Sequence, residues 1–180
     1  MKTADFTLAL LVDQSPEQVF KAVTNVRGWW SEEIEGPTTK ADEEFKYHFE
    51  DIHNCQIKVT EVIPYKKVLW HVLDNHFRPG LFAEPSHPSS TADGFDSKEW
   101  IDTKISFEIA KKENGTELRF THFGLIPEYA CFEVCSNGWN HYIGKSLLAL
   151  ITTGKGQPNG KDTPMTKDEE KFRSTRPKSK

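Results

Sequence analysis

Apolar residues recur at every second position in several short stretches of the chain, and this is the period of a β-strand. The first such stretch places Phe6, Leu8, Leu10 and Val12 on one side of the backbone. Five further strands are predicted, by the same alternation or by a continuous apolar run, over residues 44–50, 55–63, 68–73, 101–109 and 117–122. Most connections between them are short, which favours antiparallel pairing.

Two short helices are expected after the first strand. Ser15 is followed by Pro16 and, three positions after the serine, by Gln18. This combination is the capping-box start of a helix, with proline at its first position. Gly28 marks the end of this helical region, just before a pair of tryptophans.

The strongest helical pattern lies over residues 130–153. Large or apolar side chains recur there every three or four positions, beginning with Cys131, Cys135, Trp139 and Tyr142. This spacing predicts an amphipathic helix of about six turns. A curved antiparallel sheet with one apolar face can bury that stripe. We therefore predict an α+β fold in which about six strands wrap around one long C-terminal helix.

The composition divides the chain into a domain and a tail. With 180 residues, of which 36% are hydrophobic, the chain suits a single globular domain, which we place at residues 1–153. Residues 154–180 have no apolar periodicity and carry eight Lys or Arg against four Asp or Glu side chains. We expect them to form a basic, flexible tail.

The net charge is −4, and because the tail is basic, the predicted domain is acidic. An acidic domain without a basic stripe is poorly suited to binding nucleic acid. No apolar run is long enough to span a membrane, and the first residues lack the pattern of a signal peptide. The expected location is therefore the cytoplasm.

Residues 75–99 break the alternation with prolines, glycines and a Ser-Ser-Thr stretch. An irregular connection of this length is unusual in a compact domain and is often functional. Apolar residues within it, among them Phe77, Leu81 and Phe95, would either close over the interior as a lid or anchor the loop.

Several short motifs together resemble one known family. They are SPEQVF (15–20), WW (29–30), VTEVIP (59–64), KVLW (67–70), Phe107, LRFTH (118–122) and GW (138–139). Their order and spacing are similar to those of the START-like superfamily SRPBCC, in the branch named after the activator of heat-shock-protein-90 ATPase. The resemblance covers about residues 5–153. It implies a helix-grip fold with a cavity, between sheet and helix, for a hydrophobic or amphipathic small molecule.

The chain is rich in aromatic residues that could form the walls of such a cavity. Core filling is the alternative interpretation, since each ring buries about 150–250 Å². The ligand-binding residues that we predict are Trp30, Phe45, Tyr47, Phe49, Ile57, Trp70, Thr103, Phe120, His122, Cys135, Trp139 and Tyr142.

Three functions are compatible with these observations. The leading hypothesis is non-enzymatic binding of an apolar small molecule. The family branch implies a second, in which a chaperone is the partner. The third is an enzyme of the cyclase or dehydratase kind, with His122 or His71 as acid–base. A histidine held by hydrogen bonds in the core is the simpler explanation for either residue.

No sequence motif supports catalysis or a cofactor. The chain lacks HExxH, GxSxG, a Walker loop and GxGxxG. Its three cysteines, Cys55, Cys131 and Cys135, do not form the paired spacing of a zinc site, so we expect free thiols. We expect neither a metal nor another cofactor.

Overall fold

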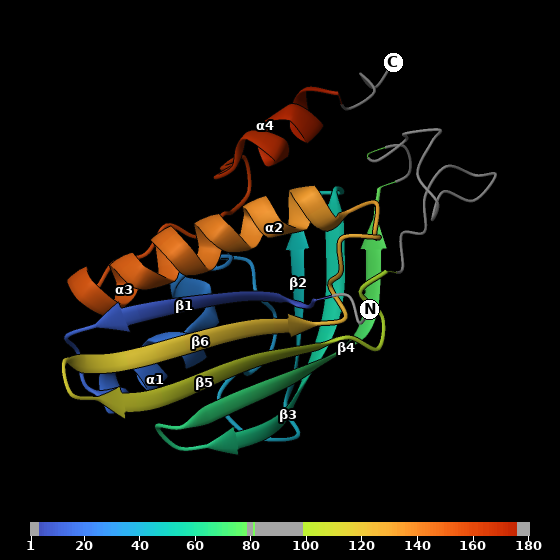
Figure 1. Cartoon of the computed structure of the whole chain (residues 1–180). Helices are drawn as coiled ribbons and strands as arrows, with labels where there is room; N and C mark the ends of the chain where they lie inside the picture. The colour runs from blue at the N-terminus through green and yellow to red at the C-terminus, as the bar shows by residue number, and fades with distance from the viewer. Residues whose placement is uncertain (1–3, 79–80, 82–98, 176–180) are drawn as a thin grey trace.

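The computed structural model describes residues 4–78, 81 and 99–175, and its centre is one antiparallel sheet (Figure 1). The strands lie in the order β1-β6-β5-β4-β3-β2, and all neighbours are antiparallel. Their bounds are β1 Phe6–Val12, β2 Glu44–Phe49, β3 His53–Ile63, β4 Lys67–Phe77, β5 Lys104–Lys112 and β6 Gly115–Phe123. The predicted sheet of about six strands is confirmed.

Two short helices carry the chain from β1, at one edge of the sheet, to β2, at the other edge. Helix α1 spans Pro16–Thr24, and the 3-10 helix η1 spans Val26–Gly28. The predicted capping box is present, because Ser15 Oγ accepts from the Gln18 amide at 3.2 Å and Gln18 Oε1 accepts from the Ser15 amide at 2.9 Å. Both predicted short helices are therefore found.

The long C-terminal helix crosses the curved sheet as one continuous element (Figure 1). It consists of α2 (Phe132–His141), a π-helical part η2 (Tyr142–Leu147) and α3 (Leu148–Thr153). The π-helical part is wider than an α-helix and buries two adjacent pairs, Tyr142–Ile143 and Ser146–Leu147. The α+β arrangement of a sheet around a helix is thus confirmed.

The segment after the long helix differs from the flexible tail expected from the sequence. Gly154 ends α3 with φ at +84°, a conformation that glycine adopts without strain. The chain then turns back along the long helix and forms α4 (Lys167–Ser174), which lies above α2 in Figure 1. Ser146 Oγ anchors this return by donating to the Trp29 carbonyl and accepting from the Gln157 amide, both at 2.7 Å.

Stacked indole rings fill the centre of the core. Trp29, Trp30 and Trp70 are nearly parallel, with centroids 6.1–6.2 Å apart. All three are buried, and Phe107 packs edge-on against Trp70 at 4.8 Å. Rings packed at these separations hold the sheet to the first helical region, because offset and edge-on contacts add to the area that they bury.

The predicted irregular segment 75–99 is only partly described. Its first residues, up to Phe77, continue β4, and residues 79–80 and 82–98 lie outside the described residues, so the expected lid also lies outside them. Within the described part of the chain, no helix combines the length and the apolar character needed to cross a membrane.

Candidate functional site

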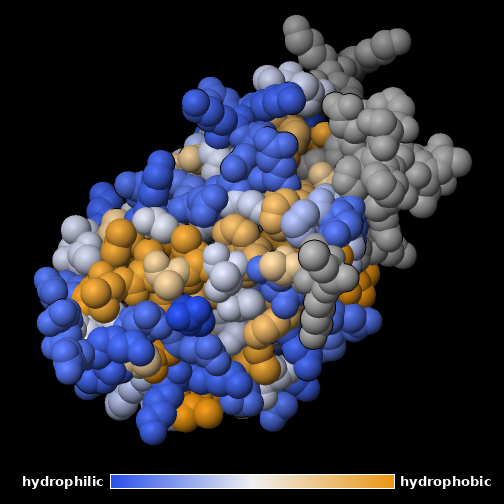
Figure 2. Space-filling model, viewed as in Figure 1, coloured by the Kyte–Doolittle hydropathy of each residue, from blue (hydrophilic) through white to orange (hydrophobic). Residues whose placement is uncertain are grey.

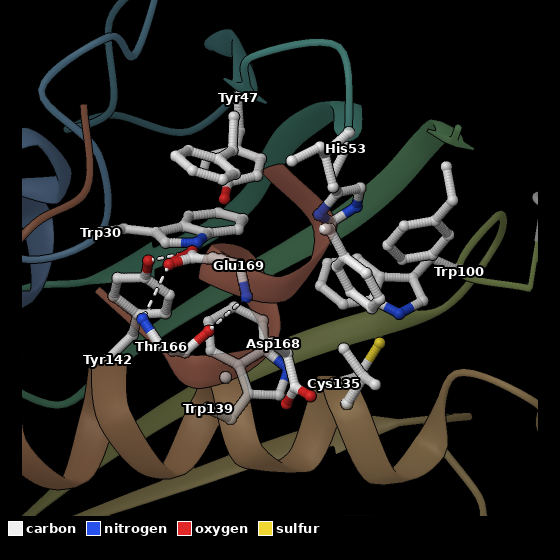
Figure 3. A pocket seen from close by; sticks show the side chains of 16 residues that line it. Trp30, Tyr47, His53, Trp100, Cys135, Trp139, Tyr142, Thr166, Asp168 and Glu169 are labelled. Carbon is white, nitrogen blue, oxygen red and sulfur yellow. Dashed lines mark hydrogen bonds between the residues drawn. The ribbon is translucent and has the colours of Figure 1, made fainter. Parts of the chain in front are cut away.

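A cavity lies between the N-terminal half of the long helix and the part of the sheet that holds β2 and β3 (Figure 3). Its volume is about 70 Å³. Helix α4 forms the remaining wall. The lining residues are Trp30, Tyr47, Phe49, Ile52, His53, Phe77, Trp100, Val134, Cys135, Gly138, Trp139, Tyr142, Thr166, Asp168, Glu169 and Phe172.

Large aromatic rings make up most of the cavity wall. Trp30 stacks on Tyr47 with ring centroids 4.2 Å apart, and Trp139 lies tilted against Trp30 at 5.1 Å. Trp100 stacks on the other side of Trp139 at 5.7 Å. These rings come from the loop after η1, from β2, from the segment before β5 and from α2, so the whole fold is needed to assemble the wall.

His53, at the start of β3, is the one histidine of the described residues that lines the cavity. It stacks on Phe77 at 4.1 Å and meets Trp100 edge-on at 4.9 Å. Burial lowers its pKa to about 4, so the ring is neutral at pH 7. Its Nε2 lies 2.7 Å from Asn75 Oδ1, an oxygen that can only accept, so the proton is on Nε2 and Nδ1 is an acceptor.

His122, on β6, is fully buried and joins two walls of the cavity without lining it. Its Nδ1 accepts from the indole N–H of Trp139 at 3.1 Å. Because an indole nitrogen only donates, the ring proton is on Nε2, which donates to Thr103 Oγ1 at 2.8 Å. Thr103 donates in turn to the Trp100 carbonyl at 2.6 Å. Burial lowers the pKa of His122 to about 3, which keeps this chain of hydrogen bonds neutral.

A polar cluster connects α4 to Tyr47 and Tyr142 in the cavity wall (Figure 3). Asn159 Nδ2 lies 2.9 Å from the Tyr47 hydroxyl, 2.8 Å from the Tyr142 hydroxyl and 3.0 Å from Glu169 Oε1. The Tyr142 hydroxyl donates to the same Glu169 oxygen. Burial and the nearby charge of Glu169 raise the pKa of Tyr47, and burial raises that of Tyr142, so both hydroxyls keep their protons.

Gly138 lies inside α2 and also lines the cavity. Glycine in a helix interior costs about 1 kcal/mol relative to alanine. A Cβ at this position would meet no described atom within 4 Å, so no close contact requires glycine here. The missing side chain leaves space in the cavity wall.

Comparison with known proteins assigns the chain to a family. Residues 13–152 match the family profile described as Activator of Hsp90 ATPase homolog 1-like protein. The chain belongs to this family. The resemblance inferred from the sequence motifs is therefore confirmed.

Several solved structures share the fold of this chain. The Aha1 dimer from Colwellia psychrerythraea is 25% identical, with a TM-score of 0.61 over 85% of this chain and 99% of that chain. A Mesorhizobium loti protein (14% identity, TM-score 0.61, 82% of this chain and 96% of that chain) shows the fold alone. A Staphylococcus saprophyticus protein (14% identity, TM-score 0.58, 85% of this chain and 95% of that chain) likewise shows the fold alone. A comparison with curated proteins finds no match.

The structure divides the predicted ligand-binding residues of this family member into two groups. One group lines the cavity: Trp30, Tyr47, Phe49, Cys135, Trp139 and Tyr142. The other group is buried in the core and does not line it: Phe45, Ile57, Trp70, Thr103, Phe120 and His122. Both groups point inward as the alternation predicted, but alternation does not tell core from cavity wall.

Several lining residues were missed by the sequence analysis. His53 lies just before the predicted strand 55–63, although β3 begins at that residue and its alternation with Cys55 puts both side chains on the same side of the strand. Trp100 follows the irregular segment, where no periodicity is available. Phe172 is a lone aromatic residue within a charged stretch, and that isolation was the signal that it has a buried partner.

The described residues contain no group of three side chains arranged to hold a metal ion. The three cysteines are buried free thiols. Burial raises the pKa of Cys55 and of Cys131, so these two thiols are protonated and poor nucleophiles at pH 7.

Proposed function

We propose that the protein binds a small apolar or amphipathic molecule in this cavity and performs no reaction on it. The main support for the proposal is Gly138. Glycine is unfavourable inside a helix, and here no close contact requires it, so the space that it leaves in the cavity wall is the best explanation for its presence. The walls around that space are mainly aromatic and aliphatic, which is typical of sites for apolar ligands.

The arrangement of the histidines favours binding over catalysis. His122 donates and accepts within the core, and it does not reach the cavity. His71, the other histidine considered as an acid–base, is only partly buried and pairs with Asp102 at 3.1 Å. His53 lines the cavity, but its low pKa leaves it without a proton to donate beyond the one shared with Asn75.

Filling the space beside Gly138 tests the proposal. We expect Gly138→Leu to fold normally, since leucine is a better helix former and its Cβ meets no described atom within 4 Å. We expect the same variant to weaken binding of the neutral aromatic probe N-phenyl-1-naphthylamine by about tenfold or more, because the side chain occupies the ligand's volume. The dissociation constant is measured from the rise in probe fluorescence.

Asn140→Leu is the matched control, because Asn140 lies on the exposed face of the same helix. It adds the same side chain outside the cavity and should bind the probe as the unchanged protein does. Equal binding by Gly138→Leu and Asn140→Leu would place the probe elsewhere and refute the proposed site.

A chaperone partner is the second candidate, and the family match favours it. The family is described by the activation of the Hsp90 ATPase, and the similar Colwellia psychrerythraea structure is an Aha1 dimer. We propose this role as an alternative. It is tested by the rate of ATP hydrolysis of Hsp90 from the same organism, with and without this protein, and an unchanged rate would exclude it.

A further inference from the structure

The C-terminal segment supplies one wall of the cavity although it lies outside the residues that match the family. The match ends at residue 152, whereas α4 begins at Lys167. Phe172 is the buried residue of α4, with 7% of its surface exposed, and it lines the cavity. The outward face of α4 is largely hydrophilic (Figure 2). This helix therefore has one apolar contact point, and that point is the cavity.

The attachment of α4 is mainly polar and partly buried, and it includes the hydrogen bonds of Glu169 with Tyr142 and Asn159. Arg78 Nη2 donates to the Phe172 carbonyl at 2.6 Å, and Arg173 forms an ion pair with Glu50 at 2.8 Å. A helix of eight residues is not stable in water by itself, so α4 keeps its structure only while it is docked. Segments held by few apolar contacts open locally at a small fraction of the cost of global unfolding.

The cavity beneath docked α4 is too small for the ligands that its walls suit. Its volume is about 70 Å³. An apolar cavity that binds benzene measures about 150 Å³, and pockets for larger ligands about 300–1,000 Å³. A ligand with even one aromatic ring therefore needs more space than the cavity offers while α4 is docked.

Removing α4 would both enlarge the cavity and make it less polar. Thr166, Asp168, Glu169 and Phe172 are the lining residues that belong to α4 or to its N-cap. The two carboxylates of the wall, those of Asp168 and Glu169, belong to this helix and would be removed with it. The walls that stay behind are mainly aromatic and aliphatic, and their polar groups are the neutral His53, Cys135 and the hydroxyls of Tyr47 and Tyr142.

Building on the proposed function, we infer that α4 is a displaceable plug, and that Phe172 occupies the place of a flat, uncharged aromatic ligand. While α4 is docked, the ligand's position is therefore taken by an aromatic side chain of the same protein. The ligand binds only when α4 has moved away, so its measured affinity is reduced by the small fraction of open molecules.

The full-length variant Phe172→Ala tests this inference with N-phenyl-1-naphthylamine as the probe. Loss of the buried ring increases the open fraction, and we expect the dissociation constant to fall by about tenfold. Phe123→Ala is the matched control, since Phe123 is 45% exposed and does not line the cavity. It should change the dissociation constant by less than about twofold.

Hydrogen exchange supplies the second measurement. With saturating probe on the unchanged protein, we expect the amides of α4 to exchange at least about tenfold faster, while those of β3 and β4 remain protected. Unchanged or weaker binding by Phe172→Ala, or retained protection of α4 in the complex, would overturn the plug and leave the proposed function standing. Probe binding that Gly138→Leu does not reduce would overturn both.

Discussion

His122 shows how one buried polar residue can order a cavity that it does not enter. Its two ring nitrogens engage Trp139 and Thr103, and through Thr103 they also fix the Trp100 carbonyl. The Trp139 indole and the backbone of Trp100 are thereby held in place. His122 is a positioning residue for the cavity, and its contribution should be visible in stability.

We expect His122→Ala to lower the free energy of unfolding by about 3 kcal/mol, because it leaves a void and an unpaired indole N–H. His122→Gln should lose less, since an amide can accept from Trp139 and donate to Thr103. Urea unfolding followed by circular dichroism measures both. His71→Ala is the control, with an expected loss under about 1 kcal/mol for its partly exposed contact with Asp102. Equal losses for the two alanine variants would contradict this role.

Sequence reasoning identified side-chain direction but not the outline of the cavity. Tyr47 and Trp139 were found because they follow the periodicities of their elements, and Trp30 because it belongs to the WW motif of the family resemblance. Trp70 follows the same rule, yet it is packed between Trp29 and Phe107 and has no free face. Which inward residue borders a void depends on how rings from distant elements pack, and no local pattern contains that information.

At the scale of elements, two helices with the same start differ in what supports them. Helices α1 and α4 both begin with a complete capping box, at Ser15 and at Thr166. Helix α1 was predicted because apolar residues follow its capping box. Helix α4 was not predicted, since Phe172 is a lone apolar residue among charged ones. The hydrogen bonds that dock α4 join residues far apart in the sequence, such as Arg78 and Phe172.

This difference predicts opposite effects of removing the two caps. Ser15→Ala should lower the global free energy of unfolding by about 1 kcal/mol, because α1 is part of the core. Thr166→Ala should leave that quantity nearly unchanged and make the α4 amides exchange about fivefold faster, because α4 opens by itself. Urea unfolding and hydrogen exchange measure the two effects. A global loss in Thr166→Ala as large as in Ser15→Ala would show that α4 unfolds together with the core.

For the whole molecule, the buried histidines link folding to pH. His53 and His122 have pKa values lowered to about 4 and about 3, and the usual value in an unfolded chain is about 6.5. Between these limits the unfolded state binds protons that the folded state does not. Stability contributed by the neutral rings is therefore complete above about pH 6.5 and is lost as the pH falls.

We expect the free energy of unfolding to fall by about 2 kcal/mol per pH unit between pH 6 and pH 4, since each histidine contributes at most about 1.4 kcal/mol per unit. In His53→Phe, which keeps a ring in the cavity wall, the slope should be about half as steep. Urea unfolding at pH 6, 5 and 4 gives the slopes. An identical slope in the variant would mean that His53 titrates normally in the folded protein.

The position of the C-terminal segment has a consequence for how such proteins diverge. Residues after 152 lie outside the family match, yet they close the cavity that the matched residues build. If the cavity binds ligands as proposed, selection can act on a short extension to change which molecules enter, and how readily, while the inherited core is left intact. Relatives that share the core but end differently would be expected to differ in ligand range even where their inner walls are the same.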